Sequence, residues 1–219
     1  MKYFIRQKSG PAFLALTLSI LISINLHAQL KPTPHLGEGP FYPPDDSKDI
    51  GNDLTAVDGS TGIPKGQIIY IIGTVKNTEG QPLAGAQVII WQTDEVGKYN
   101  HPRENRYTRD GKKLSLDPNF QYWGKTVTDE NGNYRFKTIL PGHYGGRPNH
   151  IHYKIRHPDY RVLTTELHFK GDPKLDGDFV TDGLSENQLS LLDVELKDPP
   201  EGFDDPNYQV GRFDIVLKK

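Results

Sequence analysis

Short hydrophobic runs, many with alternating polar positions, follow one another along most of this chain. Those rich in β-branched and aromatic residues predict strands at residues 68–75, 86–91, 124–128, 134–139, 150–156, 164–169 and 212–217. Turn-forming residues, such as those at 79–80 and 129–132, separate the early runs in the manner of hairpins. Residues 186–196 fit one brief helix. The pattern therefore predicts an all-β fold, an antiparallel β-sandwich with long connecting loops.

The first 28 residues have the layout of a secretory signal peptide. Two lysines and an arginine precede an apolar run over residues 11–26, and the small residue Ala28 follows it. This run is shorter than the ~20 residues that a bilayer-spanning helix requires. We therefore predict export to the periplasm or the extracellular space, without stable membrane insertion after cleavage.

Two further regions follow the predicted signal peptide. Residues 29–66 are rich in Pro, Gly and Asp, which predicts an extended N-terminal arm with turns. Residues 67–219 form the predicted sandwich domain, and a chain of this size can bury one core without disulfides. Within it, residues 98–122 form a long connection, and loops of that length in a compact domain are often functional.

Composition narrows the choice of partners. The 26 basic and 28 acidic residues form no basic block, which disfavours nucleic acid and leaves a small molecule as the expected ligand. The chain has no cysteine, so disulfides and thiolate metal sites are excluded.

Two histidines at neighbouring positions of one face carry the best chemical signal. His150 and His152 are two residues apart on a predicted strand, so both point to the same side, roughly 6.5–7 Å apart at Cα. That spacing lets both imidazoles reach one metal ion. On its own the pair is a weak signal, because two histidines on a solvated strand face would look the same.

The residues around this pair select the metal. Ile155 and Arg156 stand where a cupin-like site would need a carboxylate, and the chain has no His-Glu-x-x-His motif for zinc. Tyr144 and Tyr99 are the nearby candidates instead. A phenol with a pKa near ~10 becomes a ligand when a strongly Lewis-acidic ion removes its proton, which points to iron(III). For any one tyrosine taken alone, a place in the core or on a strand is the better interpretation.

Several segments together give the chain a resemblance to a known family. It resembles the intradiol ring-cleavage dioxygenases, and among them the beta chain of protocatechuate 3,4-dioxygenase. The matching segments, in the family's order, are residues 37–43 (GEGPFYP), 82–99, 116–120, 126–144, 147–153 (RPNHIHY), 163–173 and 212–217. They cover most of the chain after the predicted signal peptide.

The resemblance implies a non-haem iron(III) dioxygenase of aromatic compound catabolism. Tyr99 and His150 would be equatorial ligands of the iron, and Tyr144 and His152 axial ligands. A catechol-type substrate would displace Tyr144, whose departing phenolate acts as a base. Both atoms of O2 would then enter the ring between its hydroxyls, to give a cis,cis-muconate.

The resemblance also assigns catalytic roles nearby, with two departures. Arg147 matches an arginine whose charge stabilises the substrate ring, but Glu166 stands where the family has glutamine and could pair with Arg147. Gly145 and Gly146 replace a longer insert, so we expect a more open mouth and doubt protocatechuate as the substrate. Residues 108–113 form an insertion that adds charge at the same rim. A homo-oligomer and a second, related chain both stay open.

A non-enzymatic binding module is the alternative interpretation. Residues 73–99 also resemble carboxypeptidase-regulatory-like and transthyretin-like β-sandwich domains, which carry no metal. Those domains give no reason for the spacing of Tyr144, Arg147, His150 and His152. The two interpretations separate by colour, because ferric phenolate ligation makes a protein wine-red.

Overall fold

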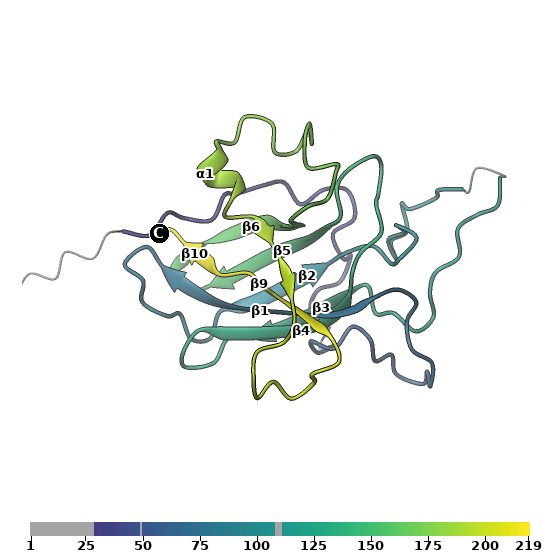
Figure 1. The fold of residues 1–219 in the computed structure, drawn as a ribbon, viewed down its shortest axis with the longest axis horizontal. Helices are drawn as coiled ribbons and strands as arrows, with labels where there is room; N and C mark the ends of the chain where they lie inside the picture. The colour runs from purple at the N-terminus through teal and green to yellow at the C-terminus, as the bar shows by residue number, and fades with distance from the viewer. Residues whose placement is uncertain (1–28, 49, 108–110) are drawn as a thin grey trace, which may run out of the picture.

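The computed structural model describes residues 29–219 except Asp49 and residues 108–110, so the predicted signal peptide and part of the insertion lie outside the described residues. Strands dominate the described part, with one short helix (Figure 1). In chain order the elements are β1 (Ile68–Asn77), β2 (Gln87–Trp91), β3 (Trp123–Val127), β4 (Asn133–Ile139), β5 (His150–His157), β6 (Tyr160–Phe169), α1 (Glu186–Leu189), β7 (Asp193–Val194), β8 (Leu196–Lys197), β9 (Gln209–Arg212) and β10 (Ile215–Leu217).

These strands form two five-stranded sheets. One has the order β10-β1-β9-β8, with β4 paired to β1, and the other has the order β3-β2-β5-β6-β7. The predicted all-β sandwich is confirmed, and strands β1 to β6 pair antiparallel within their sheets. The sheets as a whole are mixed, because β9 and β10 run parallel to β1, and β7 runs parallel to β6. Hairpin turns predict antiparallel pairs, whereas these later strands return through longer loops.

Two sequence predictions about the C-terminal part need correction. The helix expected at residues 186–196 is the short α1, and β7 and β8 take its second half. Leu192 and Val194 are buried against β6, where their carbonyls accept hydrogen bonds from the amides of His168 and Lys170 at 2.9 and 2.8 Å. The last strand is also divided in two, because the Asp214 carboxylate accepts the Thr74 amide at 2.9 Å in place of a backbone partner.

The alternation of side chains along β2 and β5 separates two apolar layers. Val88 and Ile90 of β2 belong to the main core between the sheets, together with Ile151 and Tyr153 of β5. The intervening residues of β2 belong to a second cluster, whose buried members are Ile89, Trp91 and Tyr99. The outer face of the second sheet is therefore covered as well, and His150 and His152 point to that face.

The N-terminal arm provides the cover, as its extended character predicts. The Leu36 amide donates to the Thr164 carbonyl of β6 at 2.8 Å, and Glu38 forms an ion pair with Lys154 of β5 at 2.6 Å. Further along, the ring of Tyr42 packs edge-on against Trp91, with 4.8 Å between centroids. Across the described residues, the single helix is far too short to cross a membrane.

Candidate metal centre

The candidate site is a row of buried side chains that crosses three strands of the second sheet. Strand pairing places His152 of β5 opposite Trp91 of β2 on one side and opposite Glu166 of β6 on the other. His150 lies opposite His168 in the same way. All five side chains are buried, so the histidine pair does not sit on a solvated strand face.

Tyr99 and His150 face each other at a buried position of the site. The Tyr99 hydroxyl lies 3.3 Å from His150 Nε2, and His150 Nδ1 lies 2.7 Å from the carbonyl of Pro148. A carbonyl can accept a hydrogen bond but cannot donate one, so Nδ1 carries the ring hydrogen. His150 Nε2 therefore presents a lone pair toward the tyrosine oxygen, as a metal-binding imidazole must.

His152 is held between the sheet and the arm. Its ring stacks on Trp91, with 4.8 Å between centroids and 3° between planes, and its centroid lies 4.9 Å from that of His150. On the arm side Gly39 has φ +66°, and a Cβ there would lie 3.2 Å from His152 Cε1. Glycine thus lets the arm close over the imidazole. Burial lowers the pKa of His152 to about 3, which keeps the ring neutral and able to bind a metal.

Tyr144 completes the group from the loop before β5. Its ring packs edge-on against Tyr99 at 5.4 Å and against Phe41 of the arm at 5.3 Å. The guanidinium of Arg106 lies over its other face, 4.4 Å from the ring centroid, and Glu104 holds that arginine at 3.0 Å. Tyr144 is half-buried, whereas Tyr99 is fully buried, so Tyr144 lies nearer the mouth of the site.

Two loops that cross each other set the positions of the tyrosines. Thr93 donates its hydroxyl to the Gly142 carbonyl at 2.8 Å, and the Gly142 amide donates to Asp94 at 2.8 Å. Gly97 has φ +79°, and a Cβ there would overlap the carbonyl oxygen of His143. The turn before Tyr99 and the loop before Tyr144 are therefore packed backbone against backbone.

Gly97→Ala is expected to disturb both tyrosines at once. The added methyl must separate the two loops and also sit at a positive φ, so the free energy of unfolding should fall by at least ~2 kcal/mol. Urea unfolding and metal content measure the two effects. Gly85→Ala is the matched control, because Gly85 has φ +75° with open space around it. If Gly97→Ala and Gly85→Ala lose the same stability and the same metal content, the contact between the two loops does not position the tyrosines.

A cavity of about 310 Å³ is lined by the four candidate ligands, Tyr99, Tyr144, His150 and His152. Its other walls come from the arm, the β4–β5 loop and the loop after β6, and include Gly39, Phe41, Arg147, Glu166 and Phe179. Gly145 and Gly146 are exposed, and a Cβ added at either would meet nothing within 4 Å. A cavity at the small end of the range for ligand sites suits a single aromatic ring.

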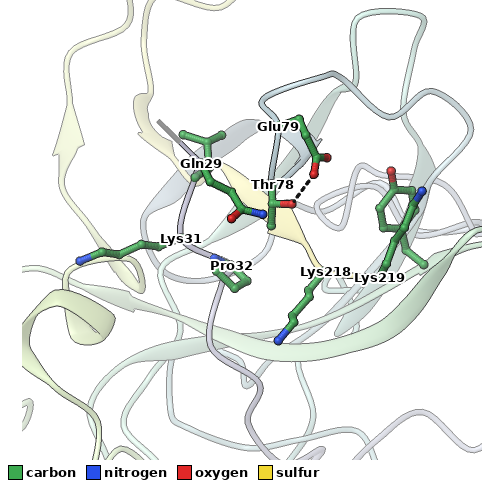
Figure 2. Close-up of a pocket in the computed structure, with 9 residues that line it drawn as sticks. Gln29, Lys31, Pro32, Thr78, Glu79, Lys218 and Lys219 are labelled. Atoms are coloured by element: carbon green, nitrogen blue, oxygen red, sulfur yellow. Dashed lines mark hydrogen bonds between the residues drawn. The ribbon is translucent and has the colours of Figure 1, made fainter. Parts of the chain in front are cut away.

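A larger cavity, about 500 Å³, lies where the arm meets the C-terminus. Figure 2 shows its lining, with Lys31, Lys218 and Lys219 around the opening and a hydrogen bond between Thr78 and Glu79. None of the candidate metal ligands lines it. Size therefore does not identify the active site, and the chemistry of the lining does.

Beside the histidines, Arg147 lies between two carboxylates. Its guanidinium donates to Glu166 at 3.0 and 2.6 Å and to Asp178 at 3.0 and 2.8 Å, and all three side chains are buried. Glu166 also accepts a hydrogen bond from His168 at 3.1 Å. The ion pair that the sequence suggested between Glu166 and Arg147 is present, and Asp178 forms a second ion pair with the same guanidinium.

The pairing fixes the charges of this group. Burial alone would raise the pKa of Glu166, but hydrogen bonds from His168 and Arg147 outweigh it and hold that pKa well below its usual range. Burial would lower the pKa of Arg147, and the bonds to Asp178 and Glu166 raise it instead. Glu166 is therefore an anion and Arg147 a cation at neutral pH.

The depressed pKa of Glu166 predicts a loss of stability in acid. A carboxylate whose pKa is lower in the folded state contributes stability above its unfolded pKa of 4.5, and the contribution fades as the pH falls below that value. We expect the wild type to lose roughly 1.4 kcal/mol per pH unit more than Glu166→Gln between pH 4.5 and 3. Urea unfolding at several pH values measures this difference, with the exposed Glu195→Gln as control. Parallel profiles would contradict an ionised Glu166.

Four side chains provide a donor set that fits a single metal ion. The histidine nitrogens and a Glu166 oxygen lie within 4.8 Å of one another, but Arg147 and His168 already bind both oxygens of that carboxylate. The donors left for a metal are the imidazoles of His150 and His152 and the phenols of Tyr99 and Tyr144. The structure thus brings together all the ligand residues that the sequence suggested.

Other residues of the site carried no assigned role in the sequence. Phe41 lies within the GEGPFYP segment, and the structure places its ring against both tyrosines. His168 follows Glu166 by two residues on a predicted strand, which is a usable signal for a shared face. Asp178 lies in a loop with no periodic pattern, and nothing in the sequence linked it to Arg147.

Comparison with known proteins agrees with the fold and the site. The dioxygenase family model matches residues 37–147 and 143–219. The beta chain of protocatechuate 3,4-dioxygenase from Burkholderia cepacia is 36% identical over 191 residues, covering 82% of this chain and 76% of the relative. Catechol 1,2-dioxygenase from Acinetobacter baylyi is 33% identical over 76% of this chain, which spans 55% of that relative.

A solved structure extends the match to three dimensions. The dioxygenase domain of a dioxygenase carbohydrate-binding protein fusion from Streptomyces sp. SirexAA-E superimposes with a TM-score of 0.60 and 30% identity, covering 86% of this chain and 99% of that one. Fold and matches together define the protein as an oxidoreductase of the dioxygenase class. Within that class, the chain belongs to the intradiol ring-cleavage dioxygenase family. The binding-module alternative covered residues 73–99, whereas the family match covers residues 37–219.

Proposed function

We propose that this protein binds one iron(III) ion through Tyr99, Tyr144, His150 and His152 and cleaves a catechol-type ring between its two hydroxyls. The observation that carries the proposal is the buried Tyr99 hydroxyl, 3.3 Å from the lone-pair nitrogen of His150. Burial raises the pKa of Tyr99 above its ordinary value, so the phenol would lose its proton only to a strongly Lewis-acidic cation. Two phenols and two neutral imidazoles favour ferric iron over zinc or magnesium.

The protein's own side chains would prepare the substrate. A bound ferric ion would supply the Lewis acidity that deprotonates the phenols and the substrate hydroxyls and that activates the ring toward O2. Phe41 and the arm provide an apolar wall for the ring and exclude water. Tyr144 lies half-buried at the mouth, where its oxygen can accept a proton from an incoming hydroxyl. Arg147 Nη1 lies 3.3 Å from His150 Nε2, so its charge faces the metal donors.

Iron content and colour test the metal half of the proposal. Protein purified after iron reconstitution under air should contain one iron per chain and show a visible wine-red phenolate band. Manganese or zinc loading should give a colourless protein. A colourless protein with no bound iron would refute the proposed ligand set.

Oxygen uptake across a panel of catechols tests the catalytic half. The red protein should consume one O2 per ring cleaved, and the product should be a cis,cis-muconate in which each of the two carboxylates carries one oxygen atom from O2 and one from a catechol hydroxyl. Isotope labelling with ¹⁸O2 and mass spectrometry make that measurement. Cleavage outside the two hydroxyls, or a red protein without turnover on any catechol, would overturn the reaction type while leaving the metal site intact.

We further propose that the chain is exported and that residues 1–28 are removed. The support is the basic start and the apolar run described above. N-terminal sequencing of protein from the periplasm or the medium of a bacterial host should give a start close to Gln29. Full-length protein retained in the cytoplasm would contradict this proposal.

A further inference from the structure

Charged groups are scarce in the walls of the 310 Å³ cavity. Among the described residues that line it, Arg147 and Glu166 are the Asp, Glu, Lys or Arg side chains, and the two histidines are proposed metal ligands. Asp178 lies directly behind Arg147 and binds two of its nitrogens. One guanidinium and two carboxylates sum to a net charge of −1 beside the site.

The cationic side chains near the rim of the cavity also have hydrogen-bond or ion-pair partners. The guanidinium of Arg106 is held by Glu104 at 3.0 Å, and Lys154 is held by Glu38 at 2.6 Å. Arg103 donates to the Pro40 carbonyl at 2.6 Å, but it is exposed to solvent, where water and salt screen its field. Among the described residues that line the cavity, an incoming carboxylate would therefore meet no buried cation without an anionic partner.

The remaining walls favour an uncharged group. Phe41 lies against the two tyrosines, and Phe179 and Val180 form the opposite rim, with Phe179 72% exposed. An apolar rim stabilises alkyl or aromatic substituents through burial. A buried anion without a partner costs several kcal/mol, and a nearby net negative charge adds to that cost.

We propose that the cavity selects catechols whose other ring substituents are uncharged, and that Glu166 and Asp178 determine this specificity by neutralising Arg147. The inference rests on the proposed function, since it assumes that the ring binds in this cavity. It assigns Asp178 a role in specificity that acts through Arg147. Under this proposal, a catechol that carries a carboxylate is a poor ligand for this chain.

Anaerobic binding to the iron-loaded protein at pH 8 tests the proposal without turnover. The two probes are 3,4-dihydroxybenzamide and 3,4-dihydroxybenzoate, which have the same shape and differ in charge. We expect the wild type to bind the amide at least about tenfold more tightly, as judged by the change in its visible band. Asp178→Asn and Glu166→Gln should each reduce that preference several-fold, mainly by tightening binding of the benzoate.

The outcomes are distinguishable. Tighter or equal binding of the benzoate by the wild type would overturn the inference and leave the proposed function standing. If the protein is colourless and binds neither probe, the proposed function fails and the inference fails with it. Asp159→Asn removes an exposed carboxylate at the β5–β6 turn and should keep the wild-type preference. Glu166→Gln keeps the shape of its side chain, so it provides the same test if Asp178→Asn yields little folded protein.

Discussion

Replacement of Tyr99 by phenylalanine is expected to remove one of the two proposed iron phenolates, to weaken and shift the visible band, and to lower the activity steeply. The ring of Tyr99 packs 4.9 Å from Phe41 and 5.4 Å from Tyr144, and phenylalanine preserves those contacts. The variant therefore removes a single oxygen, the one that faces His150. Loss of a direct ligand should exceed the roughly 10–100-fold cost of losing an outer partner of a metal site, so we expect at least a ~10³-fold fall in kcat/KM.

A second buried phenol provides the control for this experiment. Tyr153 follows His152 on β5 and points into the core between the sheets, so Tyr153→Phe removes a hydroxyl of similar burial from the opposite face. Iron content, the visible band and oxygen uptake should stay near the wild-type values in Tyr153→Phe. If Tyr99→Phe retains a full complement of iron and its colour, Tyr99 is not a ligand.

The sequence predicted the sandwich and the shared face of the two histidines for a physical reason. Strand alternation is a local property, so the side of β5 on which His150 and His152 lie could be inferred from their spacing. Six of the seven predicted strands exist as single strands and the last is divided between β9 and β10, because β-branched and aromatic runs bounded by turns are a strong local signal. Their parallel partners near the C-terminus depend on where long loops return, which no local pattern encodes.

The surroundings of the ligands were less predictable. Asp178 reaches Arg147 from a loop 31 residues away in the chain, and that approach depends on the path of the whole segment after β6. The closure of the arm over His152 depends on Gly39, whose positive φ cannot be read from one glycine among 22. Local patterns therefore placed the two histidines on one face and the family resemblance supplied the two tyrosines, whereas the charge balance around the proposed ligands required the tertiary structure.

Arg147→Met is expected to be among the most destabilising single changes in the protein. Methionine has a similar length but leaves Glu166 and Asp178 buried without the guanidinium that binds both. Removal of one partner of a buried ion pair typically costs ~3–5 kcal/mol, because the remaining charge is uncompensated. For a chain of this size, that loss should lower the unfolding midpoint by roughly 10 °C. Calorimetry and urea unfolding of the metal-free protein measure it.

Replacement of both carboxylates by amides distinguishes two causes of the lost stability, an uncompensated buried charge and simple loss of packing. If buried charge causes the loss, the triple variant Arg147→Met with Glu166→Gln and Asp178→Asn should recover at least ~1–2 kcal/mol over Arg147→Met, because no anion then remains unpaired. Loss of packing alone predicts that the triple variant is no more stable. Arg147→Lys keeps the charge but lacks the planar fork that bonds two carboxylates at once, so its stability should lie between those of the wild type and Arg147→Met.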